Sequence, residues 1–394
     1  MHQPMVLLII YLLIMIGYNY SSLIKVATEK ETLDIIRLAR SENISTSLFY
    51  QLINFFGNAQ NALENIEEFS IKGGRSKPIE ICTLEKVNLE LNGLRKYGGD
   101  VLTYQDSSYS KLLLNIYDPP PVISYVGNKE LLNKNILAIV GARNASANGI
   151  GFAKKLAHDL KNLNFILASG LARGIDTAVH ESSLPGTIAV IAGGIGNIYP
   201  PENKKLYEQI EAEGLIIAEL AYNVAPLAQH FPQRNRIISG ISSATLVIEA
   251  GLQSGSLHTA RFALEQGREV FATPGFPLDP RSKGTNLLIK EGATVLEDAQ
   301  DVINNLPRIE LYKNRFSDKG DATFIVGQNI NTSFITDEDR KFVINLLSAT
   351  PIEIDFLMQY TKLPISIIYV ILLELELANK IIRSPDNKIA LLYK

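Results

Sequence analysis

A regular alternation of apolar runs and amphipathic segments between residues 135 and 297 constrains the fold of this chain most strongly. The apolar runs are ILAIVGAR, FILASG, TIAVIAGG, LIIAEL, ATLVIEAG, REVFATPG and ATVLE. Helical patterns begin near Ile150, Ile175, Glu202, Ser256 and Gly284. Apolar strands that alternate with amphipathic helices predict an α/β fold, with a doubly wound, mostly parallel sheet and helices on both faces.

The flanking segments have different patterns. Glu31–Ile66 has helical spacing, with Ser45 and Thr46 as a candidate cap and Gly57 as a stop. Ser70–Pro78 is predicted to be a linker. Residues 98–128 mix short strands and turns around a Pro-Pro-Pro run. The polar stretch over residues 306–331 is predicted to be a second linker, and three helical segments followed by strand, turn and strand make residues 336–394 resemble a winged helix.

These patterns divide the chain into five parts. They are an apolar extension over residues 1–24, a helical domain over 25–72, the α/β domain with its lead-in over 73–310, a linker over 311–334 and a winged-helix-like domain over 335–394.

The first part contains an almost purely apolar stretch, Met5–Tyr18. It is shorter than the roughly 18–20 residues that a membrane span requires. No Lys or Arg precedes it, so the basic flank of a signal peptide is missing. Three interpretations stay open: a mis-assigned translation start, a weak membrane anchor, or a helix packed on the next domain.

Composition narrows the classes of function. The net charge of the 394 residues is -3, so a nucleic-acid site would have to be a local basic patch. The single cysteine, Cys82, excludes an internal disulfide and is predicted to pack rather than react. The five histidines show no metal-binding spacing. We therefore predict no metal and no cofactor, and a reducing, cytoplasmic location.

Glycines and cations follow several of the predicted strands. Because the carboxyl ends of parallel strands meet at one edge, we expect these loops to form a site for a phosphate-rich ligand there. The cations expected at this edge are Arg143, Arg173, Lys204, Arg234 and Arg236. No GxGxxG follows the first strand directly and no GxxxxGK[ST] occurs, which argues against NAD and against a P-loop.

The segment HFPQRNRIISG, His230–Gly240, places two arginines where a helix is predicted to begin. Cations at a helix N-terminus oppose the helix dipole, which favours an anion bound beside them. A surface salt bridge or a buried arginine pair is an equal alternative on these residues alone.

Catalytic candidates are weak. Asp176 and His180, spaced i,i+4, are expected to make a structural hydrogen bond rather than catalyse. Glu249 ends a buried strand and is expected to hold one of the arginines, although an acid or base role stays open. We predict no catalytic step.

Several long motifs identify a family resemblance. SGLARGIDTAVH, YPPEN, FPQRNRIISGIS, VIEAGLQSGSLHTARFALEQGREVFATPG and GTNLLIKEGA resemble the DNA-processing protein A family, DprA or Smf. The resemblance implies an extended Rossmann-like domain that binds single-stranded DNA without sequence preference. It also implies homodimers, and loading of the RecA recombinase during natural transformation and recombination. A SAM-like N-terminal domain and a C-terminal winged helix flank the core in many members.

The family's DNA pocket carries over motif by motif, with Gly-Ala-Arg here in place of the family's Gly-Ser-Arg. The DNA-binding residues that the resemblance implies are Gly141, Arg143, Ser169, Gly170, Arg173, Gly174, Asn203, Lys204, Phe231, Arg234, Asn235, Arg236, Gly255 and Ser256. Tyr199 and Phe231 are candidate faces for stacking bases, or pack under the loops. The role of His258 stays open.

One further expectation concerns the tail, and two alternative functions stay open. The predicted recognition helix of the tail, Pro364–Lys380, has no arginine and carries Glu374 and Glu376, so we predict that it packs against protein rather than DNA. An enzyme of the nucleotide phosphoribohydrolase type is the alternative from another class, but its PGGxGTxxE loop is missing. A membrane-tethered DNA receptor remains a third possibility if the first 18 residues are real.

Overall fold

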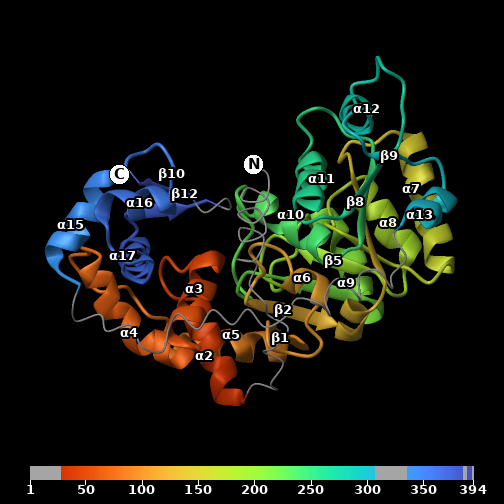
Figure 1. Ribbon diagram of the computed structural model, residues 1–394. Helices are drawn as coiled ribbons and strands as arrows, with labels where there is room; N and C mark the ends of the chain where they lie inside the picture. The colour runs from red at the N-terminus through yellow and green to blue at the C-terminus, as the bar shows by residue number, and fades with distance from the viewer. Residues whose placement is uncertain (1–27, 307–334, 385–387, 393–394) are drawn as a thin grey trace.

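The computed structural model describes residues 28–306, 335–384 and 388–392. Within these ranges a large sheet domain stands beside a second lobe, which combines the N-terminal helices with a small C-terminal domain (Figure 1). The apolar stretch Met5–Tyr18 and residues 307–334 lie outside the described residues, so the expectations for them are not addressed.

The alternating segments form the sheet that the sequence predicts. Its parallel strands are β3 (Ile136–Gly141), β4 (Ile166–Ser169), β5 (Ile188–Ile191), β6 (Leu215–Ala218), β7 (Ala244–Ile248), β8 (Glu269–Ala272) and β9 (Thr294–Val295). The order is β1-β2-β6-β5-β4-β3-β7-β8-β9. The chain winds outward from β3 in both directions, so the predicted doubly wound, Rossmann-like α/β class is confirmed, and a switch point of this kind is where such sheets bind ligands.

Two antiparallel strands extend the sheet beyond β6. They are β1 (Gly99–Thr103) and β2 (Val122–Gly127), and β2 pairs with β6 so that Ser124 lies opposite Ala218. They come from the lead-in segment, where the sequence predicted short strands and turns. The result is a sheet that is parallel in the centre and antiparallel at one edge.

Side chains alternate between two covered faces. Leu137 and Ile139 of β3 point to one face, and Ala138 and Val140 point to the other. The first face is covered by α7 (Ala147–Asn162), α8 (Ile175–Ser183), α9 (Lys204–Glu213) and α13 (Ala299–Asn305). The second is covered by α6 (Lys111–Leu114), α10 (His230–Gly240), α11 (Gly255–Glu265) and α12 (Lys283–Lys290). Burial on both faces explains why the strands are almost continuously apolar.

The N-terminal domain consists of short amphipathic helices. They are α2 (Glu29–Ala39), α3 (Thr46–Phe56) and α4 (Ala59–Lys72), followed by α5 (Leu84–Lys96). The predicted cap and stop of α3 are confirmed, because the Ser45 side chain accepts a hydrogen bond from the amide of Leu48 and Gly57 ends the helix with a positive φ of 85°.

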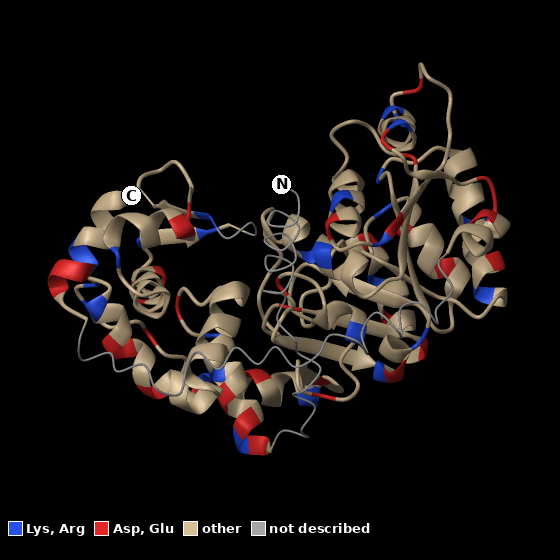
Figure 2. Ribbon diagram, in the orientation of Figure 1, with Lys and Arg blue, Asp and Glu red and all other residues tan. Residues whose placement is uncertain are grey.

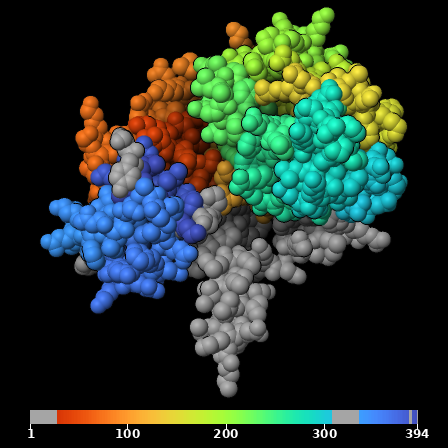
Figure 3. All heavy atoms as spheres, turned by 90° about the horizontal axis from the view of Figure 1, so that it is seen from above, coloured from red at the N-terminus to blue at the C-terminus, as the bar shows by residue number. Residues whose placement is uncertain are grey.

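The C-terminal domain has the predicted winged-helix order. It comprises α15 (Asp337–Leu346), β10 (Ile352–Glu353), α16 (Ile354–Thr361), α17 (Ile365–Leu377), β11 (Ile381–Arg383) and β12 (Lys388–Leu391). The α17 helix is almost wholly apolar and contacts α3 and α4 of the N-terminal domain. Figure 3 shows the C-terminal domain directly against the N-terminal helices.

The predicted packing role of α17 is therefore confirmed. Glu374, which was expected to repel DNA, is fully buried and forms an ion pair with Arg340 across 2.7 Å. The expectation that Ser70–Pro78 is a linker is wrong. Ser70 is buried and receives a hydrogen bond from the amide of Ile79, and the turn after α4 lies against α17.

Close approach of α4 and α17 depends on Gly73. A Cβ atom at this position would lie 1.9 Å from the Glu374 carbonyl oxygen and 2.8 Å from the Ala378 Cβ. We expect Gly73→Ala to force the helices apart and to lower the free energy of unfolding by about 1–3 kcal/mol, as overpacking does. Thermal melting measures this. Gly151→Ala in α7 is the control, because nothing lies within 4 Å of its Cβ position. Equal melting temperatures for the two variants would contradict the tight contact.

Among the described residues, no single helix has the length and apolar character needed to cross a membrane. The bent pair α16 and α17 meets that test together, by length and composition only.

Candidate nucleic-acid interface

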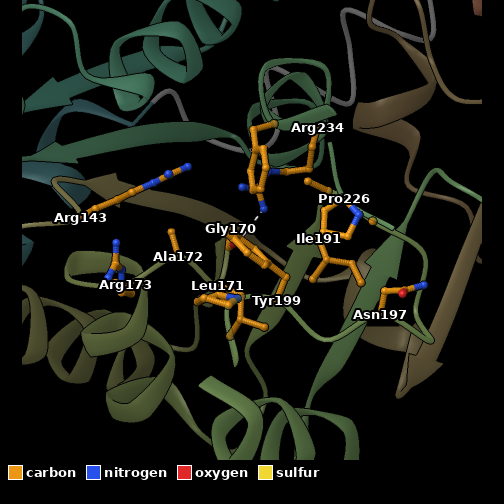
Figure 4. Close-up of a pocket in the computed structure, with 14 residues that line it drawn as sticks. Arg143, Gly170, Leu171, Ala172, Arg173, Ile191, Asn197, Tyr199, Pro226 and Arg234 are labelled. Carbon is orange, nitrogen blue, oxygen red and sulfur yellow. Dashed lines mark hydrogen bonds between the residues drawn. The ribbon is translucent and has the colours of Figure 1, made fainter. Parts of the chain in front are cut away.

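The strands β3, β4 and β5 end at a small pocket beside the first turns of α10. Loops from four segments line it: the turn after β3, residues 170–173, residues 191–200 and residues 226–234. Figure 4 shows Arg143 and Arg173 on one side of the pocket, with Tyr199 and Arg234 at its centre. At the carboxyl edge predicted from the glycine-rich loops, the candidate side chains of Arg143, Arg173, Phe231 and Arg234 line one pocket.

Three exposed cations are candidates to meet a ligand: Arg143 and Arg173 line the pocket, and Lys204 lies outside its lining. Arg143 is exposed in the turn after β3. Arg173 has a side chain that is 59% exposed and lies 3.8 Å from Glu202. Lys204, at the start of α9, is 67% exposed and only 4.0 Å from Glu208. Exposed pairs of this length contribute little to stability, so a phosphate group can compete for each cation. Positive and negative residues are interspersed elsewhere in the fold (Figure 2).

Two aromatic rings stand beside these cations. Tyr199 and Phe231 contact edge to face, with centroids 5.6 Å apart, and Tyr199 is 47% exposed. The guanidinium of Arg143 lies 5.4 Å from the centre of the Phe231 ring. An exposed ring next to a cation offers one surface for a base and one for the adjoining phosphate.

Glycines bring the backbones of the loops together. Gly174 has φ 77°, and a Cβ there would lie 2.3 Å from the Ala142 carbonyl oxygen. At Gly141, a Cβ would lie 1.9 Å from the Ile248 carbonyl oxygen. These two glycines are needed for close packing between loops, which fixes where Arg143 and Arg173 emerge.

Three predicted DNA-binding side chains turn inward instead. The Ser169 hydroxyl donates to the Ile139 carbonyl across 2.6 Å. The Asn203 amide donates to the Leu171 carbonyl across 2.9 Å. Arg234 is 6% exposed and donates to the Gly170 carbonyl across 2.6 Å, although it still contributes to the pocket lining.

Arg236 lies away from the pocket. The residue is 6% exposed, and its guanidinium pairs with Glu219 at 2.6 Å and with Asp118 at 3.0 Å. Burial alone would lower the pKa of Arg236, but the two carboxylates outweigh it and hold this pKa above its ordinary value. The sequence left open a surface salt bridge or a buried arginine pair. Both arginines are buried, but Arg236 pairs with Glu219 and Asp118, and we leave it out of the proposed interface.

The predicted helix start is corrected at the same time. The helix α10 begins at His230, so Arg234 and Arg236 lie in its second turn and do not face its dipole end. Successive positions of a helix point in different directions, and residues two apart do not share a face. The two arginines accordingly bind different parts of the protein.

The remaining candidates lie at the neighbouring helix. Asn235 donates to the Gly255 carbonyl across 3.1 Å and so ties α10 to the first turn of α11. The hydroxyl of Ser256 is 2.7 Å from that of the N-cap residue, Ser254. His258 is exposed on the same helix. Asn235, Gly255, Ser256 and His258 do not line the pocket, and Ser256 is buried.

The weak catalytic candidates have structural partners. Asp176 accepts hydrogen bonds from the amides of Gly170 and Ala172, and His180 is 2.8 Å from the Thr187 hydroxyl, so each is structural but they do not pair with each other. Burial lowers the pKa of His180 to about 3, so it stays neutral.

Glu249 and Cys82 also make structural contacts. Glu249 accepts hydrogen bonds from the backbone and the hydroxyl of Ser146, and the prediction that it holds an arginine is wrong. Burial raises the pKa of the Cys82 thiol, and this residue packs as predicted.

Sequence reasoning missed part of the pocket wall. Ile191, Asn197 and Pro226 line it, and Pro226 comes from the long connection between β6 and α10. That connection has no periodic pattern. It is held beside the loop after β5 by hydrogen bonds from the amides of Gly194 and Gly196 to the carbonyls of Val224 and Tyr222.

The sheet topology and the basic, aromatic-rimmed pocket at its carboxyl edge define a Rossmann-like ligand-binding protein with a site suited to a phosphate-bearing chain. Residues 100–307 match the model of the DNA recombination-mediator protein A family, and this chain belongs to that family. Residues 29–93 match a DprA-like N-terminal HHH domain, and residues 331–387 match a DprA winged helix domain.

Relatives and a solved structure agree with this assignment. The DNA processing protein DprA of Bacillus subtilis is 40% identical over 221 residues, which are 55% of this chain and 74% of the relative. The DprA of Streptococcus pneumoniae is 43% identical over 201 residues, or 50% of this chain and 71% of the relative. The X-ray structure of DprA from Streptococcus pneumoniae aligns with a TM-score of 0.59 and 32% identity, covering 71% of this chain and 99% of that one.

Proposed function

We propose that this protein binds single-stranded DNA without sequence preference at the pocket formed by the ends of β3, β4 and β5. The observation that carries the proposal is the grouping of exposed Arg143 and Arg173 with the half-exposed Tyr199–Phe231 pair. Cations bind the sugar-phosphate backbone and aromatic rings stack on bases of any kind, so neither contact encodes a sequence. A paired base has both faces covered, which makes a single strand the better ligand.

The downstream role follows from the family. We propose that the protein protects the bound strand and delivers it to the RecA recombinase, in natural transformation or in recombination, and that it acts in the cytoplasm. The DNA recombination-mediator family and the relatives named DNA processing protein support this role. We propose no catalytic step and no cofactor. We also propose a homodimer, which the resemblance to the family implies.

Binding to single- and double-stranded oligonucleotides of equal length across a salt series tests the proposal. Each phosphate neutralised contributes about -0.7 to the log–log salt slope of a single strand. Three exposed cations, Arg143, Arg173 and Lys204, therefore predict a slope of about -2, with clear preference for the single strand. Equal affinity for duplex, or affinity that does not change with salt, would refute it. Hydrolysis of nucleoside monophosphates would instead support the phosphoribohydrolase alternative.

A further inference from the structure

Arg234 is held beneath the loop that follows β4. One of its terminal nitrogens donates to the carbonyls of both Gly170 and Val190, at the ends of β4 and β5. A Cβ atom on Gly170 would lie 2.7 Å from the guanidinium, so glycine leaves room for it (Figure 4). Nε donates to the side chain of Asn235 across 3.2 Å. The guanidinium is thus oriented by protein acceptors before any ligand arrives.

Two other buried side chains hold the same loop. Asp176 accepts the amides of Gly170 and Ala172 at 3.1 and 3.2 Å. Asn203 donates to the carbonyl of Leu171, which has a positive φ of 56°. Left-handed backbone at a leucine is unfavourable and persists only where the surroundings fix it. Together with Arg234, these side chains fix the amides and carbonyls of residues 170–172 from the inside.

The positive charge of Arg234 and the buried carboxyl of Asp176 influence each other. Burial raises the pKa of the Asp176 carboxyl, and the positive charge of Arg234 opposes that rise. Burial also lowers the pKa of Arg234 to about 10, which still leaves it charged at neutral pH. The buried guanidinium already donates to the carbonyls of Gly170 and Val190 and to Asn235, so it has fewer donors to offer a phosphate than the exposed Arg143 and Arg173.

The loop in turn sets the positions of the exposed cations. Arg173 belongs to it directly. Gly174 packs on the carbonyls of Ala142 and Arg143, and the amide of Ile175 donates to Ala142 across 3.2 Å. A change in the shape of residues 170–172 would therefore move both Arg143 and Arg173 relative to each other.

We infer that Arg234 is a positioning residue, which shapes the loop of residues 170–174 so that Arg143 and Arg173 meet successive phosphates, rather than a phosphate ligand itself. This inference rests on the proposed binding of single-stranded DNA. It assigns the two exposed arginines to the strand and Arg234 to the scaffold beneath them.

A double-mutant cycle on the full-length protein tests the inference. Arg234→Gln and Gly170→Ala are each made in the wild type and in the Arg143→Ala/Arg173→Ala background, and affinity for an oligothymidylate is measured at low salt. In the wild type we expect either change to weaken binding by roughly tenfold. In the background without the two arginines we expect either change to weaken binding by less than twofold. If Arg234 acts through Arg143 and Arg173, its effect on affinity disappears when they are absent.

Hydrogen exchange supplies a second readout in the free protein. We expect the amides of Gly170 and Ala172 to exchange faster in both variants, whereas Lys155→Ala on α7 should leave them and the affinity unchanged. Gly170→Ala keeps every charge and displaces the Arg234 guanidinium. It therefore tests the positioning role even if Arg234→Gln does not fold.

The outcomes separate the inference from the proposed function. Equal losses in the two backgrounds would show direct contact of Arg234 with the strand and overturn the inference. Full affinity in folded Gly170→Ala protein would also overturn it. If the wild type does not bind the single strand, or if Arg143→Ala/Arg173→Ala binds as the wild type does, the proposed function fails instead.

Discussion

Replacing Arg236 with alanine is expected to destabilise the protein strongly without acting on DNA directly. The substitution leaves Glu219 and Asp118 without their shared cation, and breaking a buried pair in this way costs about 3–5 kcal/mol. We expect the lower end, about 3 kcal/mol, because Asp118 is 36% exposed and keeps part of its hydration. The melting temperature should fall by on the order of 10 °C.

The matched control for this result is Arg261→Ala. Its partner, Glu265, is one turn away on α11 and the arginine is 77% exposed, so its melting temperature should stay that of the wild type. Arg236→Lys should recover part of the loss, since it keeps the charge but not the two-pronged geometry. A stable Arg236→Ala protein with a flattened salt slope would instead place this arginine on a phosphate.

Removing Arg143 and Arg173 together is expected to have the largest effect on binding. Each charged hydrogen bond to a phosphate is worth about 1.5–3 kcal/mol, so the double variant should bind single-stranded DNA at least on the order of a hundredfold more weakly. The salt slope should flatten by about 1.4, which is 0.7 for each arginine. Both side chains are exposed, so the melting temperature should not change.

Lys155→Ala is the control, because it also removes one positive charge but at a site outside the pocket. Lys155 is 69% exposed on α7 and pairs with Asp159, and it does not line the pocket. If this variant lost as much affinity per charge as the arginine variant, general electrostatic attraction rather than the pocket would account for binding. An unchanged slope in the double variant would remove both arginines from the interface.

The order of strands and helices in the central domain could be predicted because each strand is buried on both faces. Such strands are short and continuously apolar, as in Ile136–Gly141, and they stand out from the helices between them. The turn after α4 could not be predicted in this way. Residues 73–78 have the composition of a linker, and contact with α17, which comes much later in the chain, makes Gly73 part of the interior.

The place of the pocket could be predicted, but not the direction of each side chain. The glycines and cations after β3, β4 and β5 indicated the edge of the sheet at which the pocket lies, since parallel strands bring their ends together. The spacing of Arg234 and Arg236 could not reveal their different directions, because these depend on where α10 begins and on acceptors from other segments. The carbonyl of Gly170 and the carboxylate of Glu219 are such acceptors.

The contact between α4 and α17 also bears on how the chain is made. Helix α4 ends at Lys72 and α17 begins at Ile365, so the apolar surface of the N-terminal helices is synthesised long before its covering. At about 5–20 residues per second, the interval on a ribosome is roughly 15–60 s. During that time Leu63, Ile66 and Phe69 of α4 lack the last helix that lies against the domain. The packing of the N-terminal domain against α17 can therefore be completed only near the end of translation.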